Sequence, residues 1–255
     1  MGSTERVTGI VLAGGTSRRM GTDKRSVVVD GVPMLVRAVR AVGTVADTVL
    51  VACRREDPPA PGLMAGLDAH IVHDRFENAG PLAGIEAGLS ASVGDVAIVV
   101  AADMPCLSAA VLRHLAISLR ASPRVGATVV RTSTGPEPLL AAYRPEVVGE
   151  IRRLLDSGER RVMALLGAIQ VRYVGPGAWM PLDPARRTAT SVNRPDDLCQ
   201  GPGLVPLAHA RLRGNARHAD GGPWPPGDRF GGSPGLRLRN PGQADRLVRR
   251  VAGVP

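Results

Sequence analysis

Aromatic residues are scarce in this chain of 255 residues, because Phe, Trp and Tyr together make up only 2% of it. The hydrophobic core must therefore be aliphatic and rich in alanine. No apolar run reaches the roughly 18 residues that a membrane-spanning helix needs. The three cysteines, Cys53, Cys106 and Cys199, show no C-x-x-C spacing, which argues against a disulfide framework or a zinc site. Residues 1–9 also lack the basic-then-apolar layout of a signal peptide, so we expect a cytoplasmic protein without a membrane partner.

The positive charge is concentrated near one end of the chain. The net charge is +9 and the pI is near 10.9, a balance that is typical of nucleic-acid-binding proteins. However, residues 201–255 hold nine arginines against three aspartates, and roughly a third of them are glycine or proline. We therefore predict a folded domain over residues 1–200 and a disordered tail over residues 201–255, with a functional basic arm as the alternative. Because the chain lacks the interleaved aromatics of single-strand binders, nucleic acid is not the expected partner.

Neither of the two common phosphate-binding loops is present. A P-loop needs four residues between its first glycine and a Gly-Lys-Ser/Thr triplet, whereas five residues separate Gly15 from Gly21 here. The dinucleotide fingerprint G-x-G-x-x-G is missing as well. What the chain has instead is a β-branched run over residues 7–12 that ends at a loop over residues 13–24. The sequence therefore predicts a buried strand that leads into a different kind of loop.

This loop combines paired glycines with three cations. Gly14 and Gly15 allow a ligand to approach the backbone closely, and Arg18, Arg19 and Lys24 supply positive charge. Exposed backbone N–H groups next to such charges hold anions. A solvated glycine-rich turn is the alternative. Because the cations cluster directly after the first predicted strand, we favour a nucleotide triphosphate as the ligand.

Apolar runs alternate with helical patterns along most of the chain. Strands are predicted over residues 7–12, 48–52, 71–72, 96–102, 125–130, 139–143 and 169–174. Helices are predicted over residues 33–42, 81–89, 109–119, 145–155 and 195–198, with another short one led by residues 158–163 and a loop over residues 54–66. Strands that alternate with helices indicate βαβ units. The predicted fold class is therefore α/β, with a doubly wound, mostly parallel sheet that carries helices on both faces.

Carboxylates follow two of the predicted strands. Asp103 comes directly after the most apolar strand, and Asp74 follows a shorter one and precedes the glycine-rich turn at residues 80–84. Ligands of open α/β sheets bind beyond the carboxyl ends of the strands, so we expect these groups to share one site with the loop. Mg²⁺ takes one or two carboxylates together with phosphate oxygens and water. Asp103 is therefore the candidate Mg²⁺ ligand, and a capping aspartate is the alternative.

Strong general bases are missing from the expected site. The histidines that precede the tail are His70, His73 and His114, and none lies in a nucleophile-elbow context. If the attacking group is a substrate phosphate, it is already anionic at neutral pH and needs no strong base. We therefore expect catalysis by positioning, charge neutralisation and metal clamping.

Six motifs in a row resemble those of one family. The first loop reads L-A-G-G-x-S-x-R-M-G-x-D-K over residues 12–24, and G-P-L-A-G at 80–84 and D-M-P at 103–105 follow. These three blocks are similar, in order and spacing, to the signature of the MobA-like nucleotidyltransferases. The later blocks E-P-L at 137–139, G-E-R-R-V-M at 158–163 and S-V-N-R-P-D-D-L at 191–198 resemble those of its molybdenum cofactor guanylyltransferase branch.

This resemblance implies a Rossmann-like enzyme that uses GTP, molybdopterin and Mg²⁺. Such an enzyme transfers GMP to the terminal phosphate of molybdopterin and releases pyrophosphate. Nucleotide contacts are expected from Leu12, Ala13, Gly14, Gly15, Arg18, Lys24, Asp74, Gly80, Pro81 and Leu82. Catalytic roles are expected from Lys24, Arg19, Asp103 and Arg161, with Asp103 as the metal ligand. Acceptor contacts are expected from Arg160, Arg161 and Asn193. The resemblance also suggests transient docking with a molybdenum-inserting or molybdoenzyme partner.

Two positions depart from the family pattern. Ser191 stands where the family usually has the first of two asparagines, which predicts a weaker metal or phosphate contact. Cys53 stands where an asparagine often follows the second strand, which puts a nucleoside contact in question. The paired glycines of the first loop favour guanine, since the related cytidylyltransferases resemble Ala-x-Gly there. The alternatives are a cytidylyl, phospholactate or sugar-phosphate nucleotidyltransferase, and a non-catalytic nucleotide- or nucleic-acid-binding protein that uses the basic tail.

Overall fold

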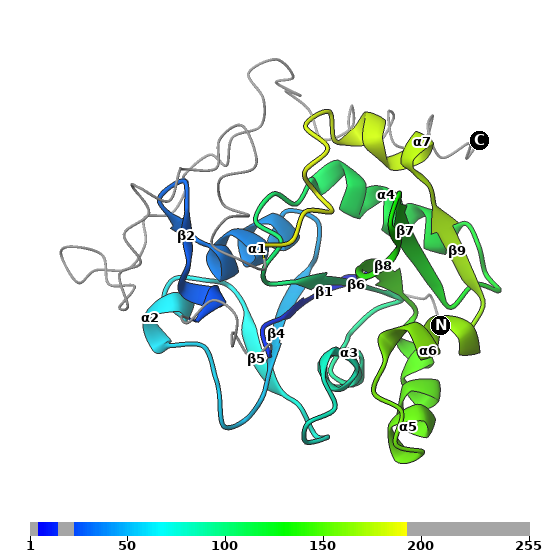
Figure 1. Ribbon diagram of the computed structural model, residues 1–255, viewed down its shortest axis with the longest axis horizontal. Coiled ribbons are helices and arrows are strands. Elements are labelled where there is room, and N and C mark those ends of the chain that lie inside the picture. The colour runs from blue at the N-terminus through cyan, green and yellow to red at the C-terminus, as the bar shows by residue number, and fades with distance from the viewer. Residues whose placement is uncertain (1–4, 15–22, 193–255) are drawn as a thin grey trace.

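A computed structural model describes residues 5–14 and 23–192 (Figure 1). The predicted helix over residues 195–198 and the predicted disordered tail lie outside these residues, as does the middle of the first loop. In the described part of the chain, no helix is long and apolar enough to cross a membrane.

A seven-stranded sheet forms the centre of the described domain, in the order β5-β4-β1-β6-β8-β7-β9. Within it, β8 runs antiparallel to both neighbours and all other described pairs are parallel. The predicted mostly parallel sheet is therefore confirmed. The strands of this sheet are β1 (Val7–Leu12), β4 (Thr48–Cys53), β5 (His70–His73), β6 (Val96–Ala101), β7 (Ala127–Thr132), β8 (Gly135–Tyr143) and β9 (Val171–Val174).

Helices cover both faces of the sheet, as predicted (Figure 1). One face carries α1 (Met34–Gly43), α4 (Ala109–Arg120) and the short α7 (Pro176–Trp179). The other face carries α3 (Pro81–Ser90), α5 (Val148–Asp156) and α6 (Val162–Ala168). Short turns of 3-10 helix occur at η1 (Lys24–Ser26), η2 (Pro145–Val147) and η3 (Met180–Leu182).

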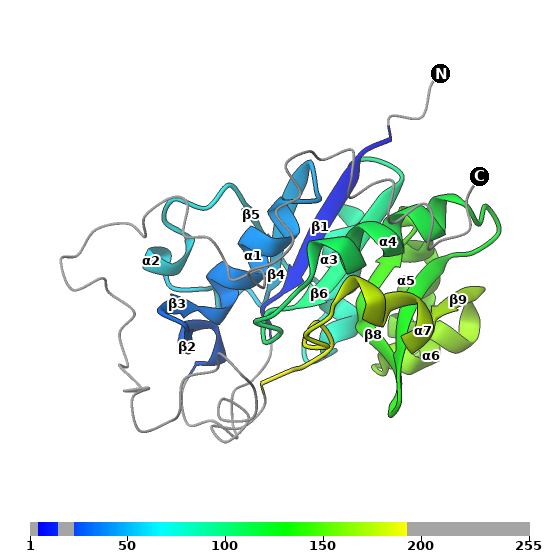
Figure 2. The same ribbon diagram turned by 90° about the horizontal axis from the view of Figure 1, so that it is seen from above.

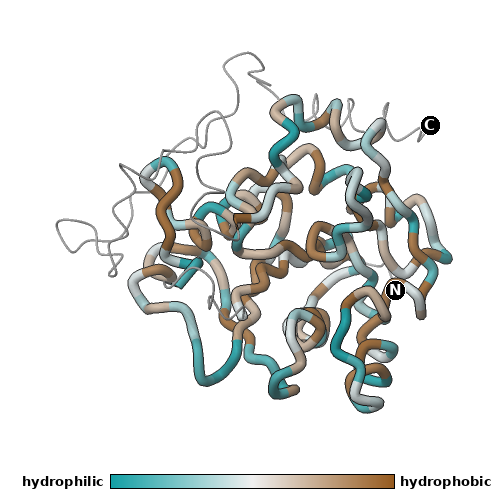
Figure 3. The backbone as a smooth tube through the Cα atoms, in the orientation of Figure 1, coloured by the Kyte–Doolittle hydropathy of each residue, from teal (hydrophilic) through white to brown (hydrophobic). Residues whose placement is uncertain are grey.

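The central strands are apolar throughout because both of their faces are buried. In β6, Ile98 and Val100 pack with the core of the α1 and α4 face, whereas Ala97 and Val99 pack with the core of the α3 and α5 face. Successive side chains of a strand point to opposite faces, so a strand between two helical layers reads as a continuous hydrophobic run. Figure 3 shows these hydrophobic segments in the middle of the molecule.

The strand order reverses between β1 and β6, which lie side by side (Figure 2). From β1 the chain proceeds outward to β4 and β5, and it then returns to β6 on the other side of β1. In doubly wound sheets, such a reversal opens a crevice at the carboxyl ends of the two strands. The first loop and Asp103 follow β1 and β6 directly, so both start at this crevice.

Strand β8 starts at Gly135, earlier than residue 139 where the sequence placed it. Pro136 and Pro138 argue against a central strand because they lack the N–H that a ladder needs. However, the pairing of β8 with β6 covers only residues 140–143, and the earlier part pairs with β7 alone. The first half of β8 is therefore locally an edge, where prolines are tolerated.

Several short elements were not predicted, among them a hairpin and a single helical turn. Strands β2 (Val28–Val29) and β3 (Val32–Pro33) form an antiparallel hairpin, and its turn residues Asp30 and Gly31 have φ values of 50° and 80°. An Asp-Gly turn with positive φ at both positions is the favoured two-residue hairpin connection. The loop predicted over residues 54–66 contains the single helical turn α2 (Pro61–Met64), so that prediction was wrong in part.

Candidate active site

A cavity of about 620 Å³ opens where β1, β4, β5 and β6 end. Its wall is formed by the ends of these four strands, the turn at η1, the start of α3, the first half of β8 and Ser191. The lining residues are Leu12, Ala13, Gly14, Lys24, Arg25, Ala52, Arg54, Asp74, Phe76, Asn78, Ala79, Gly80, Pro81, Gly84, Ala101, Ala102, Asp103, Met104, Glu137, Leu139 and Ser191.

A cation and a carboxylate meet in this cavity. The Nζ atom of Lys24, at the start of η1, lies 3.3 Å from Oδ2 of Asp103, which follows β6. Burial raises the pKa of the Asp103 carboxyl, and the positive charge of Lys24 opposes this rise. The backbone N–H of Val192 donates to the backbone carbonyl of Asp103 at 2.9 Å. The last described residues thereby lie against the end of β6.

A second carboxylate lies at the end of β5. The backbone N–H of Asp74 donates to the carbonyl of Cys53 at 2.9 Å and extends the pairing of β4 with β5. Oδ1 of Asp74 is buried, and no residue of the described chain forms a hydrogen bond with it. Burial raises the pKa of this carboxyl, and the positive charge of Arg54 opposes the rise. Since a buried acceptor without a donor costs free energy, this atom is suited to a ligand that supplies an N–H.

Two glycines lie next to the carboxylate of Asp74. A Cβ atom at Gly14 would lie 3.6 Å from Oδ2 of Asp74, and a Cβ atom at Gly84 would lie 3.6 Å from Oδ1. The Gly84 Cβ atom would also lie only 3.1 Å from a methyl group of Leu12. A Cβ atom at either position would therefore be in van der Waals contact with the carboxylate, and at Gly84 it would also be tight against Leu12.

The amino-terminal end of α3 forms another part of the wall. Gly80 precedes the helix with a φ of 62°, a conformation that favours glycine, and Pro81 occupies the first turn. The positive end of a helix dipole favours anions. Leu82 is fully buried in the core and its side chain does not line the cavity. Because Leu82 is not among the lining residues, its nucleotide contact stays a prediction.

Residues 9–171 match the family model described as the MobA-like NTP transferase domain. The chain belongs to this family. Among curated proteins, it is 36% identical over 199 residues to the probable molybdenum cofactor guanylyltransferase of Chloroflexus aggregans, which covers 75% of this chain and 91% of that protein. A protein of the same name from Natronomonas pharaonis is 34% identical over 194 residues, which covers 75% of this chain and 94% of that protein.

A solved structure extends this relationship to three dimensions. The crystal structure of molybdopterin-guanine dinucleotide biosynthesis protein A from Archaeoglobus fulgidus is similar with a TM-score of 0.65 at 27% identity. The match covers 74% of this chain and 94% of that chain. The predicted Rossmann-like fold and the predicted class of enzyme, a nucleotidyltransferase, are thereby confirmed.

Glu137 was missed as a site residue of this MobA-like transferase. It lies in the first half of β8 and lines the same cavity as Asp103. Burial raises the pKa of its carboxyl, the backbone of Leu139 opposes the rise, and the negative charge of Asp103 adds to it. Because β8 is antiparallel to β6, its beginning lies at the edge where β6 ends. The sequence showed the E-P-L block but not the direction of the strand.

The predicted acceptor arginines do not line the cavity. The side chain of Arg161 is 80% exposed, and its guanidinium forms an ion pair with Glu159 at 2.7 Å. Arg160 donates to the carbonyl of Leu155 at 2.7 Å. Their contact with the acceptor stays a prediction.

Other predicted residues fall at or beyond the limits of the described chain. Gly15, Arg18, Arg19 and Asn193 lie outside it. Ser191 lines the cavity next to that limit.

Cys53 is fully buried and is not among the lining residues. Its Sγ atom lies 3.7 Å from Nδ1 of His73. Burial and the nearby charge of Asp74 raise the pKa of this thiol to about 11. The neighbouring Ala52 and Arg54 form the wall in its place.

The donor set of the cavity fits a magnesium ion shared with phosphates. In the described ranges, no three His, Cys, Asp or Glu side chains are grouped closely enough to hold a metal ion by themselves. Mg²⁺ does not require such a group, because it takes one or two carboxylates and completes its octahedron with phosphate oxygens and water. Asp103 and Glu137 offer two carboxylates in one cavity.

Proposed function

We propose that this chain transfers GMP from GTP to the terminal phosphate of molybdopterin and releases pyrophosphate, with the assistance of Mg²⁺. The names of the two guanylyltransferase relatives and of the solved relative support this assignment. One observation of the structure supports the same assignment. A single cavity contains both the Lys24–Asp103 pair and the unsatisfied carboxylate oxygen of Asp74.

Asp74 supports guanine as the base. Guanine presents two neighbouring N–H donors, at N1 and N2, which match a carboxylate acceptor. Adenine and cytosine present a ring-nitrogen acceptor at the corresponding edge, so the carboxylate of Asp74 would face another acceptor. A buried polar group that is left unpaired in this way strongly disfavours the wrong ligand.

Lys24 and the start of α3 support a triphosphate next to that base. Lys24 contributes the positive charge that a triphosphate requires, and the amino-terminal end of α3 adds a favourable dipole. Asp103, with Glu137 beside it, would hold Mg²⁺. When bound there, the ion would withdraw charge from the phosphate oxygens and stabilise the leaving pyrophosphate.

The reaction that follows is an in-line displacement at the α-phosphorus. An oxygen of the molybdopterin phosphate forms a new bond to this phosphorus, and the bond to the bridging oxygen of pyrophosphate breaks. The electron pair leaves with pyrophosphate. No proton has to move, because the attacking phosphate is already anionic. The described lining residues include no histidine, which agrees with a reaction that needs no general base.

We further propose that Arg160, Arg161 and Asn193 bind the acceptor. The hydrogen bond between Val192 and Asp103 supports the inclusion of Asn193, because it holds the preceding residue against the end of β6. Arg160 and Arg161 carry the charge and the fork geometry that suit a phosphate monoester.

The test is a product analysis with Mg²⁺, GTP and molybdopterin. We expect molybdopterin–guanine dinucleotide, identified by its mass, and pyrophosphate in equal amounts. Formation of GDP and inorganic phosphate, or release of pyrophosphate that does not depend on molybdopterin, would contradict the proposed transfer.

A further inference from the structure

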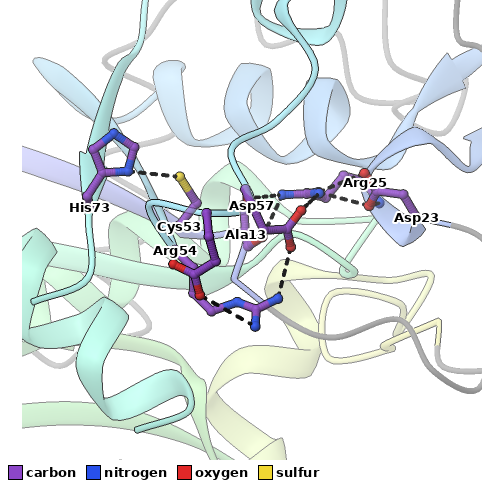
Figure 4. Close-up of polar contacts among 8 residues, drawn as sticks. Ala13, Asp23, Arg25, Cys53, Arg54, Asp57 and His73 are labelled. Atoms are coloured by element: carbon purple, nitrogen blue, oxygen red, sulfur yellow. Dashed lines mark hydrogen bonds and ion pairs between the residues drawn. The ribbon is translucent and has the colours of Figure 1, made fainter. Parts of the chain in front are cut away.

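Arg25 lies at the centre of a network of charged residues on one side of the cavity (Figure 4). It is a buried arginine, only 9% exposed, and it follows Lys24 in the turn at η1. The family motif that the sequence displays ends at Lys24, so nothing in that motif assigned a role to Arg25.

The guanidinium of Arg25 joins three segments of the chain. Its Nε–H donates to both carboxylate oxygens of Asp23, at 2.8 and 2.9 Å, within its own turn. Its Nη1 donates to the carbonyl of Ala13 at 3.4 Å and to the carbonyl of Asp57 at 2.8 Å. Its Nη2 donates to Oδ1 of Asp57 at 2.7 Å. Ala13 follows β1 and Asp57 lies in the loop after β4, so one side chain ties these two loops to the η1 turn.

The same contacts indicate that Arg25 acts on the protein and not on the phosphates. Four of the five N–H donors of a guanidinium are directed here to protein oxygens. The other oxygen of Asp57 accepts a hydrogen bond from Nη2 of Arg54 at 3.0 Å. Two arginines therefore face two aspartates, and the network as a whole offers little net charge to a triphosphate.

The network connects the two halves of the nucleotide site. Lys24, which meets Asp103, is the neighbour of Arg25 in the turn. Arg54 lines the cavity on the side of Asp74 and is held by Asp57. We propose that Arg25 is a positioning residue, which fixes the turn that carries Lys24 against the wall formed by Ala13 and Arg54. The inference rests on the proposed function for its choice of GTP as the ligand.

This role predicts a particular kinetic signature. Without the guanidinium, the η1 turn and the two loops are no longer fixed to one another, and a smaller fraction of folded molecules has the assembled cavity. The apparent affinity for a ligand falls in proportion to that fraction. Bound GTP reassembles the cavity, so turnover at saturating GTP is largely kept. Loss of stability alone would lower the Tm without changing the KM of the folded enzyme.

The experiment compares Arg25→Ala with Arg120→Ala at a temperature where both variants are folded. Arg120 on α4 is a matched control, because it forms two hydrogen bonds of 2.8 Å with the carboxylate of Asp95. Asp95 precedes β6, and neither residue lines the cavity. For Arg25→Ala we expect the Kd and the KM for Mg–GTP to rise about tenfold, with kcat within about threefold of the natural chain. For Arg120→Ala we expect a lower Tm and an unchanged Kd.

Two further variants keep the inference testable if Arg25→Ala does not fold. Arg25→Lys should behave like the alanine variant, because a single ammonium group cannot replace the planar guanidinium that donates to Asp23 and Asp57 at the same time. Asp57→Asn keeps the shape but removes the charge, and should raise the Kd by a smaller factor. An unchanged Kd in these variants, or a rise as large in Arg120→Ala, would overturn the inference.

The outcome for Arg25 is separable from that of the proposed function. If the natural chain binds GTP but forms no dinucleotide with molybdopterin, the proposed transfer fails and the Kd comparison still decides the role of Arg25. If CTP or ATP binds in place of GTP, the same comparison is made with that nucleotide.

Discussion

Glu86 joins α3 to α5, two of the helices that cover one face of the sheet, and its removal should measurably weaken the domain. Its carboxylate on α3 is fully buried. It accepts a hydrogen bond from Nε of Arg152 on α5 at 2.7 Å and another from Oγ of Ser90 at 2.9 Å. Arg75, which follows Asp74, forms a third contact with it. Glu86 therefore fixes α3, whose amino-terminal end lines the cavity, against α5 and the segment after β5.

The size of the effect follows from the exposure of the partners. Hydrogen bonds to charged groups contribute about 1.5–3 kcal/mol. Breaking a buried ion pair costs more only when it strands a buried charge. Here the side chains of Arg75 and Arg152 are 56% and 44% exposed, so both can turn to water. We expect Glu86→Gln to lower the free energy of unfolding by about 2 kcal/mol and the Tm by roughly 4–8 °C.

The pH dependence of this effect has a definite sign. Burial of Glu86 opposes ionisation, but the hydrogen bonds from Arg75 and Arg152 outweigh it and lower the pKa of the carboxyl. A group with a lowered pKa in the folded state stabilises fully above its unfolded pKa, and this contribution is lost as the pH falls through the folded pKa. The difference between the natural chain and Glu86→Gln should therefore be full at pH 7 and shrink below about pH 4.

Urea unfolding followed by far-UV circular dichroism measures this difference from pH 7 downward. Glu150→Gln is the control, because Glu150 forms its ion pair with Arg153 on the exposed surface of α5 and such pairs contribute little. We expect no measurable change of the free energy of unfolding in the control. Equal stability of Glu86→Gln and the natural chain at pH 7, or a difference that grows toward acid, would refute the reasoning.

The remaining predictions concern the cavity. Asp103→Asn should reduce Mg²⁺-dependent turnover at least about 100-fold and leave the far-UV circular dichroism spectrum unchanged. Unchanged turnover would show that Asp103 is not a metal ligand. Lys24→Ala should raise the KM for GTP and slow the transfer by about 10- to 100-fold in kcat/KM, as expected for the loss of a charge-assisted contact. An unchanged KM and kcat/KM in Lys24→Ala would mean that the triphosphate binds elsewhere. Arg161→Ala should raise the KM for molybdopterin more than that for GTP, and equal losses would contradict its acceptor-side role.

The sequence predicted the centre of the fold well because burial leaves a strong pattern there. The runs at β1 and β6 are continuous and apolar, and each ends directly at a residue of the cavity. Asp103 and Lys24 were predicted to share a site; their side chains lie 3.3 Å apart, and their roles there stay predictions. The order of strands, which places their loops together, follows from the general rule for open α/β sheets.

The rest depended on contacts that no local pattern shows. Glu137 reaches the cavity only because β8 runs against its neighbours, and the prolines around it indicate a loop when they are read alone. Arg25 follows the motif and looks like a further loop cation, yet besides Asp23 its partners are Ala13 and Asp57, the latter 32 residues away. The Asp-Gly turn at Asp30 was a visible hairpin signal, but the flanking strands of two residues each are too short to show alternation.

Nucleotide selectivity tests the central claim most directly. Pyrophosphate release is measured with Mg²⁺ and molybdopterin in the presence of GTP, CTP or ATP, for the natural chain and for Asp74→Asn. The account predicts a kcat/KM for GTP at least about 100-fold above those for CTP and ATP, and a loss of most of this preference in Asp74→Asn. A natural chain that uses CTP or ATP as well as GTP, or an Asp74→Asn variant that keeps the full preference, would contradict it.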